Sequence, residues 1–398
     1  MAVLRNLSKI LKKSAESYPV VTVTGPRQAG KTTLCRQLFG AHAYLSFEPL
    51  DSRDYACSDP RALLREYADG AVFDEVQHVP ELLTYLQAEV DERPEPGRFV
   101  LTGSQHFGLS AAISQSLAGR TAVHELFPLT FDEVARFEER PSDLLTTLWS
   151  GAYPAVFDRG IPPERWFADY VATYVQRDVR QLLAVSDLQA FSTFLKLCAG
   201  HSGQELNLTK LGAAAGVTQQ TAKAWLSVLE TSYLVIRLPA WHANLKKRLV
   251  KTPKLHMLDT GLLCHLLGIR SPDELRHHPQ RGAVFESWVV SEVHKARVHA
   301  GLSPDLFHLR QARGLEADLL VAKGARPAIV ADAKSGATIA SDWLPPLATL
   351  AGELSAAHKG APEPQPRIIY GGNRKQVRDK SEVIPWHEIQ QVPWVITE

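Results

Sequence analysis

The sequence is poor in cysteine, and the few cysteines that it has are widely separated. Its 398 residues contain four of them, Cys35, Cys57, Cys198 and Cys264. None belongs to a C-x-x-C pair, and this spacing argues against both a cysteine zinc site and a disulfide framework. Scarce, unpaired cysteine is typical of proteins in a reducing compartment, so we predict a cytoplasmic protein.

Long apolar runs and an excess of one charge sign are also missing. No stretch approaches the ~18–20 consecutive apolar residues that a membrane helix needs, so we expect no membrane association. Lysine and arginine number 44 against 43 acidic residues, and the formal net charge is +1. Any binding to nucleic acid must therefore depend on local basic patches. Hydrophobic residues make up 45% of the chain, enough for the cores of two or three domains.

A glycine-rich segment near the start of the chain has the spacing of a phosphate-binding loop. Residues 20–34 read VVTVTGPRQAGKTTL, an apolar strand pattern followed by G-x-x-x-x-G-K-T and a helix. In this motif backbone N–H groups face phosphate oxygens, the lysine contacts the β- and γ-phosphates, and the threonine hydroxyl joins the shell of Mg²⁺. A chance match in a surface loop is the alternative. The predicted cofactors are ATP and Mg²⁺, held by Gly25, Pro26, Arg27, Gln28, Ala29, Gly30, Lys31, Thr32 and Thr33.

Two further strand ends supply candidate residues for hydrolysis. Residues 70–77, GAVFDEVQ, form an apolar strand pattern that ends in two acids. We expect Asp74 to hold Mg²⁺ through water and Glu75 to act as the base for the attacking water. Residues 98–105, RFVLTGSQ, end in Ser104 and Gln105. We expect Ser104, with Gln105 as second choice, to contact the γ-phosphate or orient the water; an ordinary strand-to-loop turn is the alternative.

Apolar strand patterns alternate with helical patterns through the first region, residues 1–148. Strands are expected at residues 20–25, 44–47, 71–74, 99–103 and 122–126. This alternation predicts an α/β fold, a parallel sheet with helices on both faces, and the glycine loop makes it a P-loop NTPase core. At the end of the unit, Thr130 and Glu133 have the spacing of a capping box and predict the start of a helix.

The middle region, residues 149–280, is predicted to be mainly helical. Residues 207–238 read as a short helix, a turn, a second amphipathic helix capped by Thr218, and a strand, which is the order of a winged helix. Residues 241–258 carry five basic residues, among them Lys254, and no acid. The pattern favours contact with DNA, and a protein-binding module with a solvated basic face is the alternative. The candidate DNA-binding residues are Gln219, Gln220, Lys223, Lys246, Lys247, Arg248 and Lys251.

The last region, residues 281–398, is predicted to be a small α/β domain with a helix and three strands. Glu286 falls on the helix, Asp318 on a strand, and Asp332 and Lys334 on the next strand. Alternation along that strand puts Asp332 and Lys334 on one face. Paired acids can bind Mg²⁺, and a nearby lysine lowers the cost of forming the hydroxide that attacks a phosphodiester. These four residues are therefore candidates for a nuclease-like site. A structural domain with solvated strand ends is the alternative.

Nine stretches spread over almost the whole chain form a further pattern: GPRQAGKTTL, AVFDEVQHVPELL, RFVLTGSQ, SLAGRTAVHELFPLTFDEV, GAYPAVF, YVQRDVRQL, LDTGLL, FESWVVSEV and LEADLLV…DAKSG. In these stretches the chain resembles the prokaryotic AAA-type ATPases that carry a C-terminal domain called DUF4143. The resemblance implies an AAA+ core with Walker A and Walker B motifs and a restriction-endonuclease-like C-terminal fold. Asp332 stands where many relatives have glutamate. Asp332 and Lys334 still match the pattern of that fold, which is aspartate or glutamate, any one residue, and lysine.

The resemblance also suggests which residue links neighbouring subunits. Arg120, in the LAGR stretch, resembles a sensor or arginine finger that reaches the γ-phosphate of an adjacent subunit, and would tie hydrolysis to assembly. Arg177 and Arg180, in YVQRDVR, are the alternatives, and a surface or interdomain salt bridge is the alternative role for each of them.

These features lead to three functional hypotheses. The first is an oligomeric motor, a ring and possibly a hexamer, in which ATP hydrolysis moves the winged-helix and C-terminal regions against duplex or branched DNA. The second is a nucleotide-dependent switch that remodels a protein partner and retains an inactive nuclease fold. The third is an ATP-controlled, metal-dependent DNA nuclease. Stimulation of ATP turnover by DNA, weakened by salt, separates the first hypothesis from the second.

Overall fold

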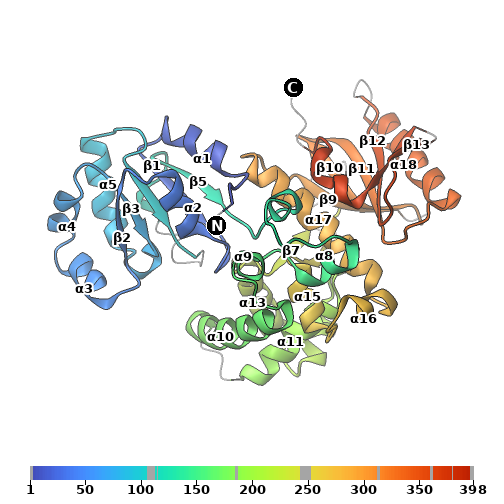
Figure 1. Ribbon diagram of the computed structural model, residues 1–398, viewed down its shortest axis with the longest axis horizontal. Coiled ribbons are helices and arrows are strands. Elements are labelled where there is room, and N and C mark those ends of the chain that lie inside the picture. The colour runs from blue at the N-terminus through green and yellow to red at the C-terminus, as the bar shows by residue number, and fades with distance from the viewer. Residues whose placement is uncertain are drawn as a thin grey trace. The chain divides into compact units, whose positions relative to one another are not determined.

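The computed structural model describes residues 3–104, 113, 115–183, 187–242, 252–311, 314–358, 362–378 and 380–394 (Figure 1). The chain forms two compact units. The N-terminal unit comprises Met1–Leu129, Thr231–Tyr233 and Val298–Leu302, and the C-terminal unit comprises Thr130–Glu230, Leu234–Arg297 and Ser303–Glu398. In the part of the chain that the structure describes, no helix is long and apolar enough to cross a membrane.

The N-terminal unit is built on a five-stranded parallel sheet with the order β2-β3-β4-β1-β5. Its central strands are short, apolar and buried throughout, as expected when helices cover both faces. The carboxyl ends of parallel strands share one edge of the sheet, and the glycine loop begins at this edge. The elements are α1 (Ser8–Ala15), β1 (Val20–Thr24), α2 (Lys31–Leu38), β2 (Ala43–Ser46), α3 (Leu50–Ser58), α4 (Pro60–Glu66), β3 (Ala71–Asp74), η1 (Val76–His78), α5 (Leu82–Glu92), β4 (Phe99–Thr102) and β5 (Thr121–Glu125).

Two hydrophobic cores flank this sheet, because successive side chains of a strand point to opposite faces. On β1, Val20 packs into one core and Val21 into the other. Leu63 of α4 and Leu86 of α5 belong to the first core, whereas Leu34 of α2 belongs to the second. The helix that follows the glycine loop is thus fixed against the sheet by its own apolar residues.

The C-terminal unit begins with helices and a small sheet of order β6-β8-β7. Its helices are α7 (Phe131–Val134), α8 (Leu144–Ser150), α9 (Pro154–Asp158), α10 (Pro163–Leu183), α11 (Leu188–Gly200), α12 (Leu208–Ala214), α13 (Gln219–Thr231), α15 (Thr260–Leu266) and α16 (Pro272–His277). Its strands are β6 (Gln204–Glu205), β7 (Val235–Leu238) and β8 (Lys254–Met257), and β8 is antiparallel to both neighbours. The capping box predicted at Thr130 and Glu133 is present at the start of α7.

Two glycines let α15 pass close to the segment after α8. Gly151 has φ 67°, and a Cβ added to Gly261 would lie 2.8 Å from Gly151 Cα. Asp259 caps α15 by accepting the N–H of Leu262 at 2.9 Å, and its second oxygen accepts the N–H of Ala152 at 2.8 Å. The GAYPAVF and LDTGLL stretches therefore meet at a structural crossing.

A six-stranded mixed sheet of order β13-β14-β12-β11-β10-β9 completes the C-terminal unit. On one face of this sheet, Val289 of α17 and Leu319 of β10 lie in a core that also contains residues of the preceding helices. On the other face, Leu347 of α18 and Leu320 of β10 lie in a second core. The elements are α17 (Arg281–His299), β9 (Leu306–Arg310), β10 (Glu316–Lys323), β11 (Arg326–Lys334), η2 (Ser341–Trp343), α18 (Leu344–Ala357), β12 (Gln365–Tyr370), β13 (Gln376–Arg378), β14 (Ser381–Pro385) and η3 (Trp386–Gln391). The region boundaries at 148/149 and 280/281 stay predictions.

Candidate functional site

The glycine loop leaves β1 and enters α2 through backbone conformations that favour glycine. Gly25 has φ 143°, and a Cβ at this position would lie 2.1 Å from the carbonyl oxygen of Leu126. Gly30 has φ 94° and occupies the N-cap of α2. Gln28 also has a positive φ, 60°. These dihedral angles wrap the loop tightly at the start of a helix, the geometry that turns backbone N–H groups toward an anion.

Lys31 is buried inside this loop. Its ammonium group donates to the carbonyl oxygens of Gly25 at 3.1 Å and Pro26 at 2.9 Å. Burial lowers the pKa of Lys31 to about 8, although Glu75 and Asp74 act in the opposite direction. The cation is therefore held within the loop that would surround the phosphates.

Three hydroxyl groups converge on the carboxylate of Asp74, at the end of β3. Thr32 donates to both of its oxygens at 3.0 Å, and Tyr44 of β2 donates to Oδ2 at 2.8 Å. Thr102, at the end of β4, donates to Oδ1. A hydroxyl beside a buried carboxylate is the donor set that Mg²⁺ takes in P-loop enzymes, so Thr32 and Asp74 fit this cation.

Tyr44 and Thr102 were not predicted from the sequence. Both lie on strands that flank β3, and their position beside Asp74 depends on the strand order β2-β3-β4. Burial raises the pKa of Tyr44 to about 12, and its hydrogen bond to Asp74 adds to this effect. The phenol therefore stays protonated and remains a donor to the carboxylate.

Glu75 directly follows β3 and adopts the left-handed backbone region, with φ 60° and ψ 42°. Such a conformation costs a non-glycine residue of order 1–3 kcal/mol and is concentrated at functional sites. Gln77 donates its side-chain N–H to Glu75 Oε2. Glu48 and His78 have ligand atoms close to those of Glu75, and His78 Nε2 lies 3.2 Å from Glu48 Oε2. Burial, helped by Arg53, lowers the pKa of His78 against the opposing effect of Glu48.

Ser104 follows β4 at the same edge of the sheet as Asp74. Its side chain is buried, and its hydroxyl has no hydrogen-bond partner among the described residues. Ser104 thus lies at the strand end where the sequence places it, and its role toward the γ-phosphate stays a prediction. Gln105, the second choice, lies outside the described residues.

Arg120 is not brought to the glycine loop of its own chain. It precedes β5, whose Thr121 pairs with Val20 at the amino end of β1, so Arg120 lies at the opposite edge of the sheet. Its guanidinium forms two hydrogen bonds to Asp91 of α5, at 2.5 and 2.8 Å. Any role as an arginine finger must therefore be played in another subunit. The side chains of Arg177 and Arg180 lie outside the described part of the structure.

The nuclease-like candidates of the C-terminal unit do lie together. Asp318 and Asp332 occupy adjacent antiparallel strands, where Asp332 Oδ1 accepts the N–H of Asp318 at 3.3 Å and Asp318 Oδ2 accepts the N–H of Ala333 at 3.0 Å. Lys334 Nζ lies 3.2 Å from Asp332 Oδ2, on the shared face that alternation predicts. Burial, then Asp318, raises the pKa of Asp332 to about 6.

The contacts of Lys254 differ from those that the sequence predicted. The sequence placed it in the basic run expected to contact DNA, but its ammonium group binds Glu286 Oε1 at 2.8 Å and Asp318 Oδ1 at 3.4 Å. Burial disfavours the ammonium form, yet Glu286 and Asp318 outweigh burial and raise the pKa of Lys254. The pKa of Glu286 is raised to about 8, mainly by burial and then by Asp318, against the effect of Lys254. The physical reason for this difference is topology, since the folded chain brings Lys254 of β8 within reach of Glu286 on α17 and Asp318 on β10.

The other predicted DNA-binding residues are only partly described. Gln219, Gln220 and Lys223 are exposed at the start of α13, and the hydroxyl of Thr218 accepts the N–H of Thr221 at 3.1 Å, as expected of a cap. Lys246, Lys247, Arg248 and Lys251 lie outside the described residues. They fall between β7 and β8, which pair as an antiparallel hairpin.

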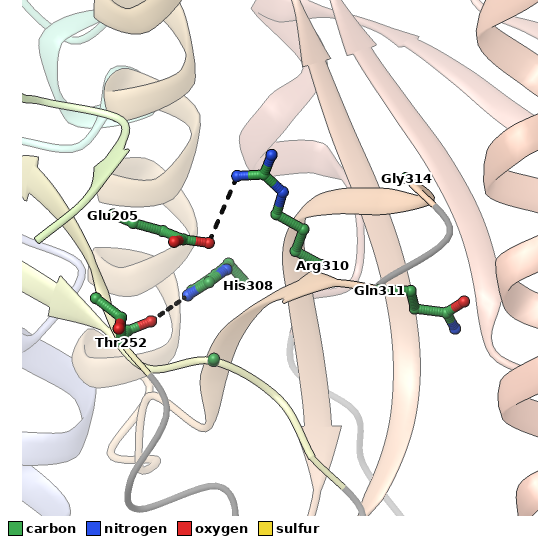
Figure 2. A pocket seen from close by; sticks show the side chains of 7 residues that line it. Glu205, Thr252, His308, Arg310, Gln311 and Gly314 are labelled. Atoms are coloured by element: carbon green, nitrogen blue, oxygen red, sulfur yellow. Dashed lines mark hydrogen bonds and ion pairs between the residues drawn. The ribbon is translucent and has the colours of Figure 1, made fainter.

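A cavity of about 450 Å³ in the C-terminal unit is lined by residues of β6 and β9 and by Thr252, just ahead of β8. Figure 2 shows Arg310 of β9 facing Glu205 of β6, with 3.6 Å between Nη1 and Oε1, and His308 facing the carbonyl oxygen of Thr252 at 3.1 Å. Glu205 is the register partner of Lys254. Among the described lining residues, the oppositely charged Glu205 and Arg310 face one another.

Family models match three consecutive stretches of the chain. One described as an AAA domain matches residues 17–135, a domain of unknown function, DUF8612, matches residues 141–273, and DUF4143, also a domain of unknown function, matches residues 281–389. Two uncharacterized proteins, Rv2008c of Mycobacterium tuberculosis and Mb2031c of Mycobacterium bovis, are each 32% identical over 330 residues, which is 81% of this chain and 72% of the relative.

Two solved structures show weak similarity to this chain. The Walker-type ATPase PABY2304 of Pyrococcus abyssi is 16% identical with a TM-score of 0.46, over 65% of this chain and 94% of that chain. A RuvB variant of Thermotoga maritima is 20% identical with a TM-score of 0.32, over 59% of this chain and 89% of that chain. The fold and the glycine loop define a P-loop ATPase of the AAA type. The chain belongs to the family of AAA-type ATPases that carry a C-terminal DUF4143 domain.

Proposed function

We propose that this protein hydrolyses ATP with Mg²⁺ at the edge of the N-terminal sheet and uses the energy to act on DNA as an oligomer. The observation that carries the proposal is the bond of Thr32 to both oxygens of Asp74 at 3.0 Å, with Glu75 as the next residue. This arrangement joins the phosphate loop to the strand end that supplies the base.

Each residue of the site has a separate task in this proposal. Lys31 moves from the loop carbonyls to the β- and γ-phosphates, and the loop N–H groups hold the same anion. Thr32 would hold Mg²⁺ directly and Asp74 would hold it through water, and the ion would supply positive charge that offsets the charge of the phosphates. Glu75 accepts the proton of the water that attacks the γ-phosphorus, and ADP leaves as the bond to the bridging oxygen breaks. Ser104 orients that water or contacts the γ-phosphate.

The proposed DNA contacts belong to the C-terminal unit. The order α12, turn, α13 and β-hairpin is that of a winged helix, and Gln219, Gln220 and Lys223 are exposed where a recognition helix meets base edges. The basic residues between β7 and β8 would contact phosphates in the position of a wing. Arg120 would complete the ATP site of the neighbouring subunit in a ring, possibly a hexamer.

The first test is steady-state ATP hydrolysis with and without single-stranded, duplex and four-way-junction DNA, at low and high salt. We expect stimulation by duplex or junction DNA that falls as salt rises, and no turnover by Lys31→Ala under any condition. Stimulation that is lost in Lys223→Ala would assign α13 to the DNA surface. A working basal rate with no response to any DNA at low salt would reject the motor and favour the protein-directed switch.

A further inference from the structure

The carboxylates of the C-terminal unit are already occupied by cations of the same chain. Lys254 Nζ lies 2.8 Å from Glu286 Oε1 and 3.4 Å from Asp318 Oδ1, and only 12% of the Lys254 side chain is exposed. It comes from β8, a different element from the helix and the strands that carry the acids. Lys334 covers the remaining acid, with its ammonium group 3.2 Å from Asp332 Oδ2.

The other oxygens of the two aspartates are bound to the backbone. Asp318 Oδ2 accepts the N–H of Ala333 at 3.0 Å, and Asp332 Oδ1 accepts the N–H of Asp318 at 3.3 Å. These two bonds follow from the pairing of β10 with β11, so they are part of the sheet. They fix both carboxylates in the orientation that meets the two lysines.

This arrangement does not fit the divalent metal that a restriction-endonuclease-like fold implies. Mg²⁺ needs oxygen ligands at about 2.0–2.1 Å in nearly octahedral geometry, and it keeps several waters. Here an ammonium group lies between the two carboxylates that would have to share the ion, and a second one lies against the third carboxylate. A dication placed among them would meet two positive groups at short range in a partly buried site, where like charges repel strongly.

We infer that Lys254 is an internal cation that takes the place of a divalent metal between Glu286 and Asp318, so that this cluster binds no metal. The lysine provides the charge that the buried acids require, and the C-terminal domain folds without an ion. The acids then stabilise the folded domain through their ion pairs with lysine. The domain offers a binding surface and does not hydrolyse phosphodiesters. This inference goes beyond the proposed ATPase and does not depend on it.

The test measures binding of Mn²⁺ by electron paramagnetic resonance in the full chain without nucleotide. We expect the same weak binding for the wild type and Asp318→Asn, because the cluster takes no part in it. Lys254→Met removes the charge but keeps the length of the side chain, and it should gain a site that binds Mn²⁺ at least roughly tenfold more tightly. The double variant Lys254→Met/Asp318→Asn should lose this site again, and Lys254→Arg, which keeps the positive charge, should never gain it.

Two results would overturn the inference. One is Mn²⁺ binding by the wild type that disappears in Asp318→Asn. The other is a folded Lys254→Met variant, checked by circular dichroism, that gains no site. If Lys254→Met does not fold, the comparison of the wild type with Asp318→Asn decides alone. Nicking of plasmid DNA by the wild type with Mg²⁺ or Mn²⁺, abolished in Asp332→Ala, would also contradict the inference.

Discussion

At the scale of single residues, the N-terminal unit gathers polar groups around Asp74. Thr32, Tyr44 and Thr102 all donate to this carboxylate, and each comes from a different element. The next residue, Glu75, is restrained by Gln77 and by its own left-handed backbone. The neighbouring acids are therefore held differently, which matches the separate tasks proposed for them.

Glu75→Gln should separate nucleotide binding from hydrolysis. The amide cannot accept a proton, so we expect the turnover number to fall by about 10²–10⁴-fold while ATP still binds. Measured together, steady-state hydrolysis and fluorescent-nucleotide binding check this prediction. Glu81→Gln, at an exposed glutamate just ahead of α5, is the matched control and should keep normal turnover. Normal turnover in Glu75→Gln would mean that another residue is the base.

The buried ammonium of Lys31 predicts an alkaline limit for the use of ATP. Burial lowers its pKa to about 8, so above that pH the free protein loses the charge that meets the phosphates. We expect kcat/KM for ATP, which reports groups of the free enzyme, to fall about tenfold for each further pH unit. Nucleotide affinity in Lys31→Met, by contrast, should be weak and independent of pH over the same range. A wild-type profile that stays level well above pH 8 would contradict the prediction.

At the scale of elements, the C-terminal unit depends on the close approach of α15 to the turn after α8. A Cβ on Gly261 would lie 2.4 Å from the ring of Phe167, which is buried and cannot move aside without disturbing the core. The LDTGLL stretch thus has a packing reason for its glycine, and Asp259 adds the cap of the helix.

Gly261→Ala should therefore destabilise the C-terminal unit by about 1–3 kcal/mol, the usual cost of overpacking a core. The matched control is Gly352→Ala on α18, where an added Cβ meets nothing within 4 Å. Because alanine favours a helix over glycine, this control should stabilise the protein by about 0.5–1 kcal/mol. Denaturant unfolding of both variants gives the comparison. If both substitutions changed the free energy of unfolding equally, the close approach at Gly261 would not be what requires glycine there.

At the scale of the whole molecule, Arg120 cannot serve the site of its own chain, because it lies at the opposite edge of the sheet. If it is an arginine finger, Arg120→Ala should lower ATP turnover by about 10³-fold or more. Lys31→Ala should be inactive for a different reason, since it loses the phosphate contact.

Mixing these two inactive variants tests the assembly directly. In a mixed ring, an intact Lys31 from one subunit meets an intact Arg120 from its neighbour, so we expect activity to return. Arg165→Ala, at a largely exposed arginine paired with Asp169, is the control and should behave as the wild type. No recovery in a mixture that is shown to contain mixed oligomers would leave Arg120 as a partner of Asp91 alone.

Much of the fold follows from local sequence. The five strands of the N-terminal sheet, the helix after the glycine loop and the helical middle region lie where the apolar patterns predict them, because each pattern reflects burial of a single element. Strands β6, β8, β13 and β14 and helix α18 were not predicted. β6 is only two residues long, and the strand β8 begins within a basic run, so neither has a clear periodic pattern.

The sequence by itself determined the glycine loop, the two neighbouring acids at the end of β3 and the family, because these depend on residues that are neighbours along the chain. Only the tertiary structure decided which hydroxyl groups meet Asp74, on which edge of the sheet Arg120 lies, and what neutralises Glu286 and Asp318. Those contacts join elements that are far apart in the sequence and are set by strand order and packing. Lys254 is the clearest case, since the same ammonium group reads as a DNA contact in its basic run and becomes an internal counter-ion once β8 lies beside α17.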